Sequence, residues 1–245
     1  MDYNPFSLQG KTILVTGASS GIGREIAIHA AKSGSSLILT GRNTERLNET
    51  LKIIGADKHK AISADLSTRE GINKLIHALP VLDGVVQSAG ISKRLPLKFI
   101  SEKSLDELMR INFTAPALLT RAIYKQKLLR DEASIVFISS IASSFASLGS
   151  IMYMASKGAV NSFMKGIAFE LATTGIRANS IQPGMIKTHL TTISDEAIQK
   201  DIQNYPLGRY GQPEEVAYAA IYLLSDATQW MTGSILTIDG GLTLR

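Results

Sequence analysis

A tyrosine and a lysine four residues apart, Tyr153 and Lys157, carry the clearest chemistry in the sequence. If this stretch is helical, both side chains lie on one face and can meet. A phenol transfers protons poorly near neutral pH because its pKa is about 10, and a neighbouring ammonium group lowers that pKa. Ser140 closes the preceding apolar strand and could donate a hydrogen bond to a carbonyl oxygen. These residues predict proton transfer to or from a carbonyl group, with an ordinary solvated helix surface as the alternative interpretation.

The segments around these residues alternate between short apolar strands and helices. The hydrophobic pattern predicts strands at 11–16, 36–40, 60–64, 84–87, 134–139 and 177–181, and a last strand and turn at 234–241. Such alternation predicts an α/β fold with a three-layer, doubly wound parallel sheet and right-handed crossovers. A chain of 245 residues without an evident linker is expected to form a single domain over residues 1–245.

A glycine-rich turn follows the first predicted strand. Gly17, Gly21 and Gly23 lie between this strand and a helical pattern from Glu25 to Lys32. Glycine permits a tight turn and a close approach of the backbone to a pyrophosphate, whose charge is favoured at the start of a helix. A glycine-rich turn alone also occurs where no ligand binds, but this position between strand and helix is typical of dinucleotide binding.

The end of the second predicted strand indicates which dinucleotide binds. A carboxylate there would hydrogen-bond the adenosine ribose of NAD and repel the 2′-phosphate of NADP. The sequence has Gly41 and Arg42 instead, and a guanidinium group suits a phosphate. We therefore expect NADP (NADPH) as the cofactor rather than NAD, unless Arg42 simply faces solvent.

The next two strand ends also carry small or polar residues. Asp65 and Leu66 follow the third strand and could hold an adenine, although Asp65 could equally belong to the N-cap region of the next helix. Ser88, Ala89 and Gly90 follow the fourth strand. Ligands bind at the carboxyl ends of the strands in open parallel sheets, so these residues are candidates for cofactor contacts.

A long helix is predicted from Ser101 to Leu129 with a polar interruption at Asn112. Asparagine is a poor helix-interior residue, so Asn112 indicates either a local distortion or a contact with water, and Pro116 supports a bend. Cations gather toward the end of this helix and either complement its dipole or receive an acidic partner: Arg121, Lys125, Lys127 and Arg130.

The second half of the chain is expected to complete the pocket. The helix from Tyr153 to about Ala172 mixes small and large apolar residues, which suggests burial in a subunit interface. Thr188 could hold a carboxamide, and the poorly patterned residues 189–210 are expected to form a substrate loop whose closure excludes water. An apolar wall beside Tyr153, or alternatively part of the core, is expected from Phe145, Leu148, Met152, Met154 and Leu190.

Composition argues against several other classes of protein. Cysteine is absent and the four histidines lack metal-ligand spacing, so neither thiolate chemistry nor a metal site is expected. No apolar run approaches the roughly 20 residues of a membrane span and no signal-like start is evident, so we expect a cytoplasmic protein without membrane contact. The net charge of +5 is spread along the chain, which argues against a nucleic-acid partner.

Together these motifs resemble the short-chain dehydrogenase/reductase family over essentially the whole chain. The resemblance is carried by Thr16-Gly17-x3-Gly21-Ile22-Gly23, Asn112, Ser140, Tyr153-x3-Lys157, Pro183-Gly184 and Asp239-Gly240-Gly241. It implies a Rossmann-type fold, usually in homotetramers, with a catalytic tetrad. In that tetrad Asn112 holds a water, Ser140 orients the substrate oxygen, Tyr153 exchanges the proton and Lys157 binds the nicotinamide ribose and tunes the tyrosine. The resemblance also implies cofactor contacts from Gly17, Ser19, Ser20, Gly21, Ile22, Gly23, Arg42, Asp65, Leu66, Ser88, Ala89, Gly90, Tyr153, Lys157, Pro183, Gly184, Ile186 and Thr188.

Within the family the chain is most similar to the 3-oxoacyl-[acyl-carrier-protein] reductases, by its length and by residues 206–209 and 211–215. Two departures are evident. Gln87-Ser88-Ala89-Gly90 replaces the common Asn-Asn-Ala-Gly. Thr173-Thr174 stands where carrier-protein-dependent reductases often have a basic residue, which argues against docking of an acyl carrier protein.

The resemblance implies an NADP(H)-dependent enzyme that transfers a hydride between nicotinamide and a carbonyl or alcohol substrate. Reduction of a 3-oxoacyl thioester is one candidate reaction. Dehydrogenation of a sugar, a steroid or another small alcohol is the alternative. A non-catalytic dinucleotide-binding protein is an alternative function, against which the intact tetrad argues.

Overall fold

The computed structural model describes residues 3–188 and 195–244. Its strands are β1 (Thr12–Thr16), β2 (Ser36–Gly41), β3 (His59–Ser63), β4 (Leu82–Gln87), β5 (Leu129–Ile138), β6 (Arg177–Pro183) and β7 (Ile235–Ile238). Its α-helices are α1 (Gly21–Lys32), α2 (Thr44–Ile54), α3 (Arg69–Ala78), α4 (Glu102–Met109), α5 (Ala115–Lys125), α6 (Ile151–Glu170), α7 (Asp195–Asp201) and α8 (Pro213–Leu224).

The strands form one sheet in the order β3-β2-β1-β4-β5-β6-β7, and every neighbouring pair is parallel. The predicted α/β fold with a doubly wound parallel sheet is therefore confirmed. The direction of winding reverses between β1 and β4. In such sheets the crevice outside the carboxyl ends at this switch point is where a ligand binds.

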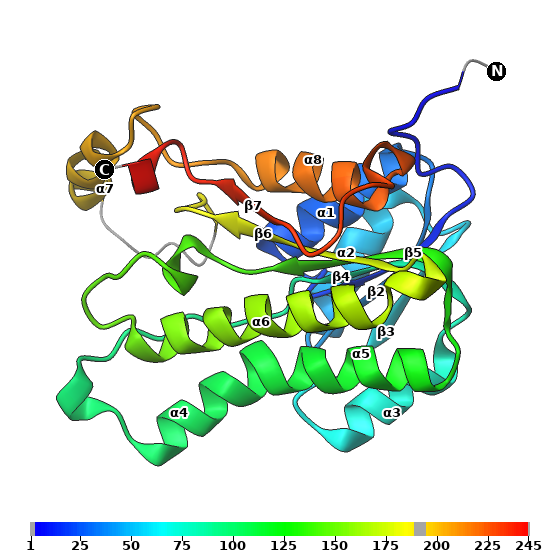
Figure 1. Cartoon of the computed structure of the whole chain (residues 1–245), viewed down its shortest axis with the longest axis horizontal. Coiled ribbons are helices and arrows are strands. Elements are labelled where there is room, and N and C mark those ends of the chain that lie inside the picture. Colours follow the sequence, from blue (N-terminus) through cyan, green and yellow to red (C-terminus); the bar gives the residue numbers. More distant parts are fainter. Residues whose placement is uncertain (1–2, 189–194, 245) are drawn as a thin grey trace.

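Helices cover both faces of the sheet (Figure 1): α1, α2 and α8 lie on one face, and α3, α4, α5 and α6 lie on the other. Leu14 on β1 packs into the core on the α5 and α6 side, whereas Ile13 and Val15 pack into the core on the α1 and α8 side. Successive strand residues point to opposite faces, so strands covered on both faces consist of continuous apolar runs. No helix within the described ranges 3–188 and 195–244 is long and apolar enough to span a bilayer.

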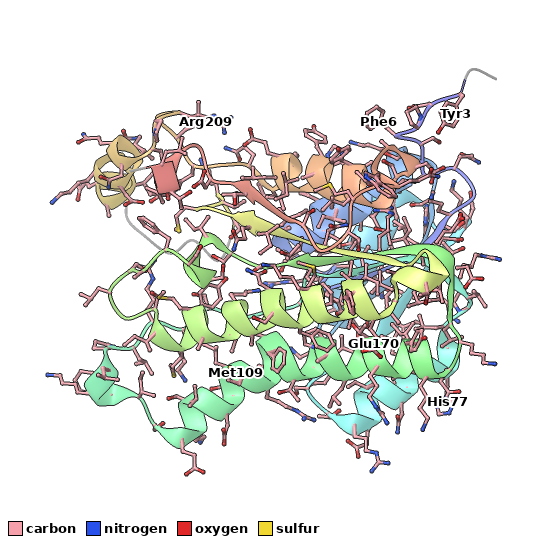
Figure 2. The ribbon with its side chains drawn as sticks, in the orientation of Figure 1. Tyr3, Phe6, His77, Met109, Glu170 and Arg209 are labelled. Atoms are coloured by element: carbon pink, nitrogen blue, oxygen red, sulfur yellow. The ribbon has the colours of Figure 1, made fainter. Side chains whose placement is uncertain are left out.

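The helix expected over 101–129 has the predicted interruption. It consists of α4, a π-helix at Arg110–Thr114 and α5, with Met109 at the end of α4 (Figure 2). The expected end at Leu129 is wrong, because Lys127 takes the left-handed φ of 55° and the chain turns into β5. Arg130 consequently lies on β5, where its guanidinium pairs with Asp83 at 3.0 Å instead of facing the helix terminus.

Candidate active site

The glycine turn between β1 and α1 is shaped by close backbone contacts. Gly17 and Gly21 have φ values of 68° and 54°, in the left-handed region that favours glycine. A Cβ on Gly23 would lie 2.4 Å from the carbonyl oxygen of Gly17, and a Cβ on Gly17 would lie 3.0 Å from the backbone of Ala89. Ser20, the N-cap residue, makes no side-chain capping bond to the first turn of α1. This cradle of backbone N–H groups suits a pyrophosphate.

The ends of β2 and β3 adjoin the turn. A Cβ on Gly41 would lie 3.3 Å from the hydroxyl of Ser19, so β2 ends directly beside the turn. Arg42 follows with an exposed side chain. It lies close enough to Asp65, at the end of β3, to contribute to the low pKa of that carboxylate. An exposed guanidinium at this place can reach a phosphate on the adenosine ribose.

Asp65 and Leu66 differ in their surroundings. The Asp65 carboxylate accepts hydrogen bonds from the hydroxyl of Ser67 at 2.7 Å and from its N–H at 2.9 Å. These bonds, the hydroxyl first, hold the pKa of Asp65 below its usual value. Thr68 is the N-cap residue of α3, and its N–H and hydroxyl donate to the carbonyl of Asp65, so Asp65 lies in the turn that leads into this cap. The Leu66 side chain is buried in the core and does not lie on the surface. Its predicted contact with an adenine stays a prediction.

Arg24 contacts the turn and was not among the residues predicted from the sequence. Its Nη2 donates to the carbonyl of Ser19 at 2.7 Å and to the carboxylate of Glu49 on α2 at 3.0 Å. Its Nε is buried and has no hydrogen-bond partner among the described residues. A buried donor without a partner beside the turn fits a site that receives an anionic group. The position directly after Gly23 was the only signal for it in the sequence.

Ser140, Tyr153 and Lys157 come together at the carboxyl end of β5. Tyr153 and Lys157 are one turn apart on α6, and the Lys157 Nζ lies 5.7 Å from the centre of the Tyr153 ring. Lys157 is buried, and its Nζ donates to the carbonyl of Ile138 on β5 at 2.8 Å. Ser140 shares a hydrogen bond with Tyr153, and its Oγ also accepts from the N–H of Ala142 at 3.1 Å. The structure thus brings together the three side chains that the sequence spacing predicted.

Burial sets the proton affinities of this group. It raises the pKa of the Tyr153 phenol, and the hydrogen bond with Ser140 acts in the opposite direction. Burial also lowers the pKa of the Lys157 ammonium to about 8. The expected lowering of the Tyr153 pKa by Lys157 therefore does not dominate, because desolvation of the phenol is the larger effect and the ammonium is directed at Ile138.

Asn112 lies inside the π-helix, and the predicted local distortion is confirmed. Its Oδ1 accepts from the N–H of Ile91 at 2.8 Å, while its Nδ2 donates to the carbonyl of Ile91 at 2.9 Å and to Ser156 at 3.1 Å. Both amide N–H groups are therefore engaged by the protein, and the role of holding a water stays a prediction. A Cβ on Gly90 would lie 3.6 Å from the Nζ of Lys157, so Asn112 secures this segment beside the lysine.

The chain after β6 returns toward the glycine turn. A Cβ on Gly184 would lie 3.0 Å from the Cα of Asp239, so the Pro-Gly and Asp-Gly-Gly segments pack on each other. Ile186 is buried in the core on the α1 and α8 side. Thr188 lies over the turn, with its Cγ2 3.6 Å from a Cβ placed on Gly21. Segments separated by more than 160 positions thus face one another, as the predicted cofactor contacts require.

The described part of the expected substrate loop, residues 195–210, is secured by two buried tyrosines. The rings of Tyr205 and Tyr210 meet edge to face with centroids 5.5 Å apart, and the Tyr210 hydroxyl donates to Asp201 at 2.7 Å. Arg209 lies at the surface (Figure 2) and forms a two-bond ion pair with Glu215 at 2.7 and 2.8 Å. Residues 189–194 lie outside the described residues.

The residues expected to form an apolar wall beside Tyr153 lie in different surroundings, and the wall stays a prediction. Met152 is 2% exposed, and its sulfur lies 3.6 Å from the hydroxyl of Ser104, so it belongs to the core. Phe145 and Leu148 are 36% and 91% exposed on the loop that precedes α6. Leu190 lies outside the described residues. Within residues 3–188 and 195–244, no group of three His, Asp or Glu side chains could hold a metal ion.

The whole chain is similar in sequence to known oxidoreductases. The family model described as enoyl-(acyl carrier protein) reductase matches residues 17–243. Gluconate 5-dehydrogenase of Gluconobacter oxydans is 35% identical, with 98% of this chain and 97% of the relative covered. The 3-oxoacyl-[acyl-carrier-protein] reductase FabG of Rickettsia felis is 34% identical, with 97% and 98% covered. The chain belongs to the short-chain dehydrogenase/reductase family.

Solved structures agree with this membership. A dehydrogenase/reductase of Sinorhizobium meliloti superposes with a TM-score of 0.91 at 34% identity, and 97% of each chain is covered. A structure from Agrobacterium tumefaciens, described as a 2-deoxy-D-gluconate 3-dehydrogenase with bound NADP, superposes with a TM-score of 0.88 at 33% identity. That comparison covers 99% of this chain and 100% of the other. The protein is accordingly an NAD(P)-dependent oxidoreductase that acts on CH–OH groups.

The structure explains how this short-chain dehydrogenase/reductase accommodates Gln87 in place of the usual asparagine. The Gln87 side chain is buried and bonds the hydroxyl of Thr16 at 3.5 Å and that of Thr120 at 3.3 Å. Thr16 in turn accepts the backbone N–H groups of Ser88 and Ala89 at 3.0 and 3.1 Å. The longer amide therefore links α5 to the strand ends beside the glycine turn, and the departure preserves the support of this turn.

Proposed function

We propose that this protein is an NADP(H)-dependent carbonyl reductase or alcohol dehydrogenase in which Tyr153 exchanges the proton. The observation that carries the proposal is the convergence of Ser140, Tyr153 and Lys157 at the end of β5, beside Gly90 and the glycine turn. The nicotinamide, when bound, supplies or accepts the hydride. A substrate whose carbonyl carbon lay next to the nicotinamide would have its carbonyl oxygen beside the hydroxyls of Ser140 and Tyr153.

The residues of the chain divide the proton work between them. In the reducing direction Ser140 donates a hydrogen bond to the substrate oxygen, and Tyr153 gives that oxygen a proton as the carbon gains the hydride. The alcohol leaves, and the tyrosine regains its proton from solvent. Lys157 would hold the nicotinamide ribose, and its buried charge favours the phenolate that forms. Asn112 holds the segment at Gly90 beside that lysine.

The residues at the adenosine end favour NADP. Gly41 leaves room beside Ser19, and the exposed Arg42 offers a guanidinium group where NAD-dependent proteins place a carboxylate. The Agrobacterium relative described with bound NADP supports the same choice. Backbone N–H groups of the glycine turn would hold the pyrophosphate, with Arg24 behind them.

The proposal is tested by titrating the purified protein with NADPH and with NADH and following fluorescence. The tighter cofactor is then used with a panel of ketones, 3-oxoacyl thioesters and sugar acids. We expect NADPH to bind more tightly and at least one carbonyl or alcohol class to turn over. Binding of neither dinucleotide would contradict the cofactor site, and binding without any turnover would favour the non-catalytic alternative.

Two substrate classes follow from the relatives. The FabG relative is a 3-oxoacyl-[acyl-carrier-protein] reductase, which makes a 3-oxoacyl thioester one candidate. Thr173 and Thr174 argue against docking of the carrier protein itself, so a thioester of a small thiol is the better test compound. The gluconate 5-dehydrogenase relative makes a sugar acid the second candidate.

Arg94 favours an anionic substrate such as a sugar acid. It follows the segment that Asn112 secures, and its Cβ lies 3.6 Å from a Cβ placed on Gly149, just before α6. Burial and then Asp201 raise the pKa of Tyr205, in the described part of the substrate loop, to about 12. The charge of Arg94 acts on the same pKa in the opposite direction, so Arg94 lies near this tyrosine. Among the described residues Arg94 has no ion-pair partner, so its charge is available to a carboxylate.

This second candidate predicts a split between substrates. Arg94→Met should raise the KM for gluconate-type substrates about tenfold or more, because it removes a charge-assisted hydrogen bond, and should change the KM for a neutral ketone little. Lys93→Met is the matched control, since Lys93 already pairs with Glu107 at 3.3 Å. Equal changes for both substrates would contradict a carboxylate contact.

We further propose assembly into a homotetramer. Phe169, on the helix expected to form an interface, is 89% exposed on the protomer, and Trp230 is fully exposed before β7. Large apolar side chains exposed in this way support a covered surface in the assembly. Light scattering of the purified protein measures the assembly directly, and a monomeric mass would contradict it.

A further inference from the structure

Ser143 is half-buried and is the centre of a polar network behind the candidate catalytic serine. Its hydroxyl accepts a hydrogen bond from the Nδ2 of Asn161 on α6 at 3.0 Å and a second from the Nε2 of Gln182 on β6. Asn161 and Gln182 are only 8% and 7% exposed. Two buried amide groups therefore depend on one hydroxyl group for their partner.

The far side of each amide is also engaged. The Oδ1 of Asn161 accepts from Ser180 on β6 at 3.0 Å, and the Oε1 of Gln182 accepts from Thr237 on β7 at 3.2 Å. Each amide is thus held at both ends, which directs its N–H group at Ser143. The network joins two neighbouring strands and α6 to a single residue of the loop after β5.

That loop is the one that presents Ser140. Ser143 is the last residue of the 3-10 turn Ile141–Ser143, and Ser140 is the N-cap of this turn, bonded through its Oγ to the N–H of Ala142 at 3.1 Å. Ser140 and Ser143 are therefore the two ends of one rigid turn. Asn161 lies one helical turn beyond Lys157 and two turns beyond Tyr153 on α6. The network therefore fixes the position of Ser140 relative to the helix that carries Tyr153 and Lys157.

We propose that Ser143 is a positioning residue for the reaction: it holds Ser140 in register with Tyr153 by accepting hydrogen bonds from α6 and β6. The residue touches neither substrate nor cofactor in this role. The inference depends on the proposed function, because it assigns the network a purpose only if Ser140 acts on the substrate. Small displacements of a hydrogen-bonding group near the reacting atoms reduce turnover strongly, so a network that prevents displacement of Ser140 supports turnover.

The test compares Ser143→Ala, Ser143→Thr and Ser140→Ala in the full-length protein with NADPH and the best substrate of the panel. We expect Ser143→Ala to lower kcat roughly tenfold while the KM for NADPH stays within about twofold, since only the orientation of Ser140 changes. Ser143→Thr keeps the hydroxyl oxygen and should restore most of kcat. Ser144→Ala is the matched control, because the side chain of this exposed neighbour makes a long hydrogen bond, to the carbonyl of Ile141 at 3.5 Å, that its backbone N–H also makes at 3.0 Å.

The pH profile separates positioning from general stability. Tyr153 is faced by Ser140 and by the ammonium of Lys157, and the Ser140 bond lowers the pKa of the phenol. A displaced Ser140 weakens that bond, so the kcat profile of Ser143→Ala should move to higher pH, which a purely structural loss would not cause. Asn161→Ala removes one donor and leaves Ser143 in place, and it should show a smaller change in the same direction if Ser143→Ala does not fold.

The outcomes are distinct. Unchanged kcat and an unchanged pH profile in Ser143→Ala, with activity lost in Ser140→Ala, overturn this inference alone. The inference is likewise overturned if Ser143→Thr fails to restore activity, or if Ser144→Ala loses as much as Ser143→Ala. Full activity in Ser140→Ala overturns both this inference and the proposed function.

Discussion

The two halves of the candidate site are built from different materials. At the nucleotide half, the backbone of β1, the glycine turn and the end of β4 approach so closely that side chains are excluded: a Cβ on Gly23 would collide with the carbonyl of Gly17. At the catalytic half, buried polar side chains do the positioning, with Lys157 bonded to Ile138 and Asn112 bonded to Ile91. The nucleotide half depends on the absence of Cβ atoms at its glycines, whereas the catalytic half depends on the polar atoms of its side chains.

This difference decides how each half can fail. Adding a methyl group to the glycine turn should disturb folding and cofactor binding together, because the backbone itself must move. Removing the hydroxyl of Ser140 or Tyr153 should leave the cofactor bound and reduce turnover, because most of the proposed cofactor contacts lie in the other half. Variants in each half can therefore be ranked by their expected effects and checked against this division.

The largest effect is expected at the catalytic half from Tyr153→Phe. Loss of the phenolic proton should lower kcat on the order of 10³-fold while the affinity for NADPH changes little. Steady-state kinetics and a fluorescence titration on the same preparation measure both quantities. Tyr124→Phe, at an exposed tyrosine of α5, is the control and should keep full activity. Equal turnover in Tyr153→Phe and the wild type would remove the tyrosine from the mechanism.

Lys157→Met should change the pH dependence of stability. The pKa of Lys157 is about 8 in the folded protein and near 10.4 when unfolded, so the unfolded state binds more protons between these values. The free energy of unfolding of the wild type should therefore rise by up to about 3 kcal/mol between pH 8 and pH 10 through this group. The folded pKa of Tyr153 is raised, so that group begins to lower stability only above about pH 10.

Urea unfolding at pH 7.0 and at about pH 9.5 measures this contribution. Lys157→Met should lose the rise, and Lys165→Met, at an exposed lysine of the same helix, should keep it. A rise of the same size in Lys157→Met and the wild type would show that the buried ammonium is not its source.

Gly23→Ala tests the nucleotide half. The added Cβ would lie 2.4 Å from a backbone oxygen that cannot move freely, so we expect a loss of about 3 kcal/mol in the free energy of unfolding and weaker NADPH binding. Gly166→Ala on α6 is the matched control, because its Cβ would have no atom of the protomer within 4 Å other than its chain neighbours and the nearby backbone of α6. It should stabilise the protein by up to about 1 kcal/mol, since alanine favours a helix. Comparable losses in both variants would contradict the packing argument.

Arg42→Ala should have the smallest effect on the protein itself and act on cofactor choice. Removing the guanidinium should reduce the preference for NADPH over NADH by roughly 10-fold to 100-fold, the value of a charged hydrogen bond to phosphate, without changing stability measurably. Arg46→Ala, at an exposed arginine in the first turn of α2, serves as the control. An unchanged ratio of the two dissociation constants in Arg42→Ala would place the 2′-phosphate elsewhere.

The sequence pattern was sufficient to predict those structural features that depend on residues close together in the chain. The strand-turn-helix around Gly17, Gly21 and Gly23 was predictable because glycine placement and apolar runs are local signals. The pairing of Tyr153 with Lys157 was predictable for the same reason, since a helix sets the spacing. The alternation of elements then determined the parallel sheet, because crossovers between parallel strands need helices.

Three-dimensional packing decided the features that involve residues far apart. The break at Asn112 was predictable from the residue type, but its partner Ile91 lies twenty-one positions away, and no local signal could specify that partner. The predicted end of α5 was wrong because the left-handed turn occurs at Lys127, and the sequence has no glycine there to indicate a turn.

The sequence by itself determined the fold class, which is encoded in short-range periodicity, and it predicted the tetrad residues through their resemblance to the family. Only the tertiary structure decided the environment of those residues. The burial that lowers the pKa of Lys157 and raises that of Tyr153 is created by packing α6 against the sheet. The network around Ser143 likewise requires α6, β6 and β7 to meet. Proton affinity and orientation depend on these long-range contacts, and such contacts exist only after the chain has folded.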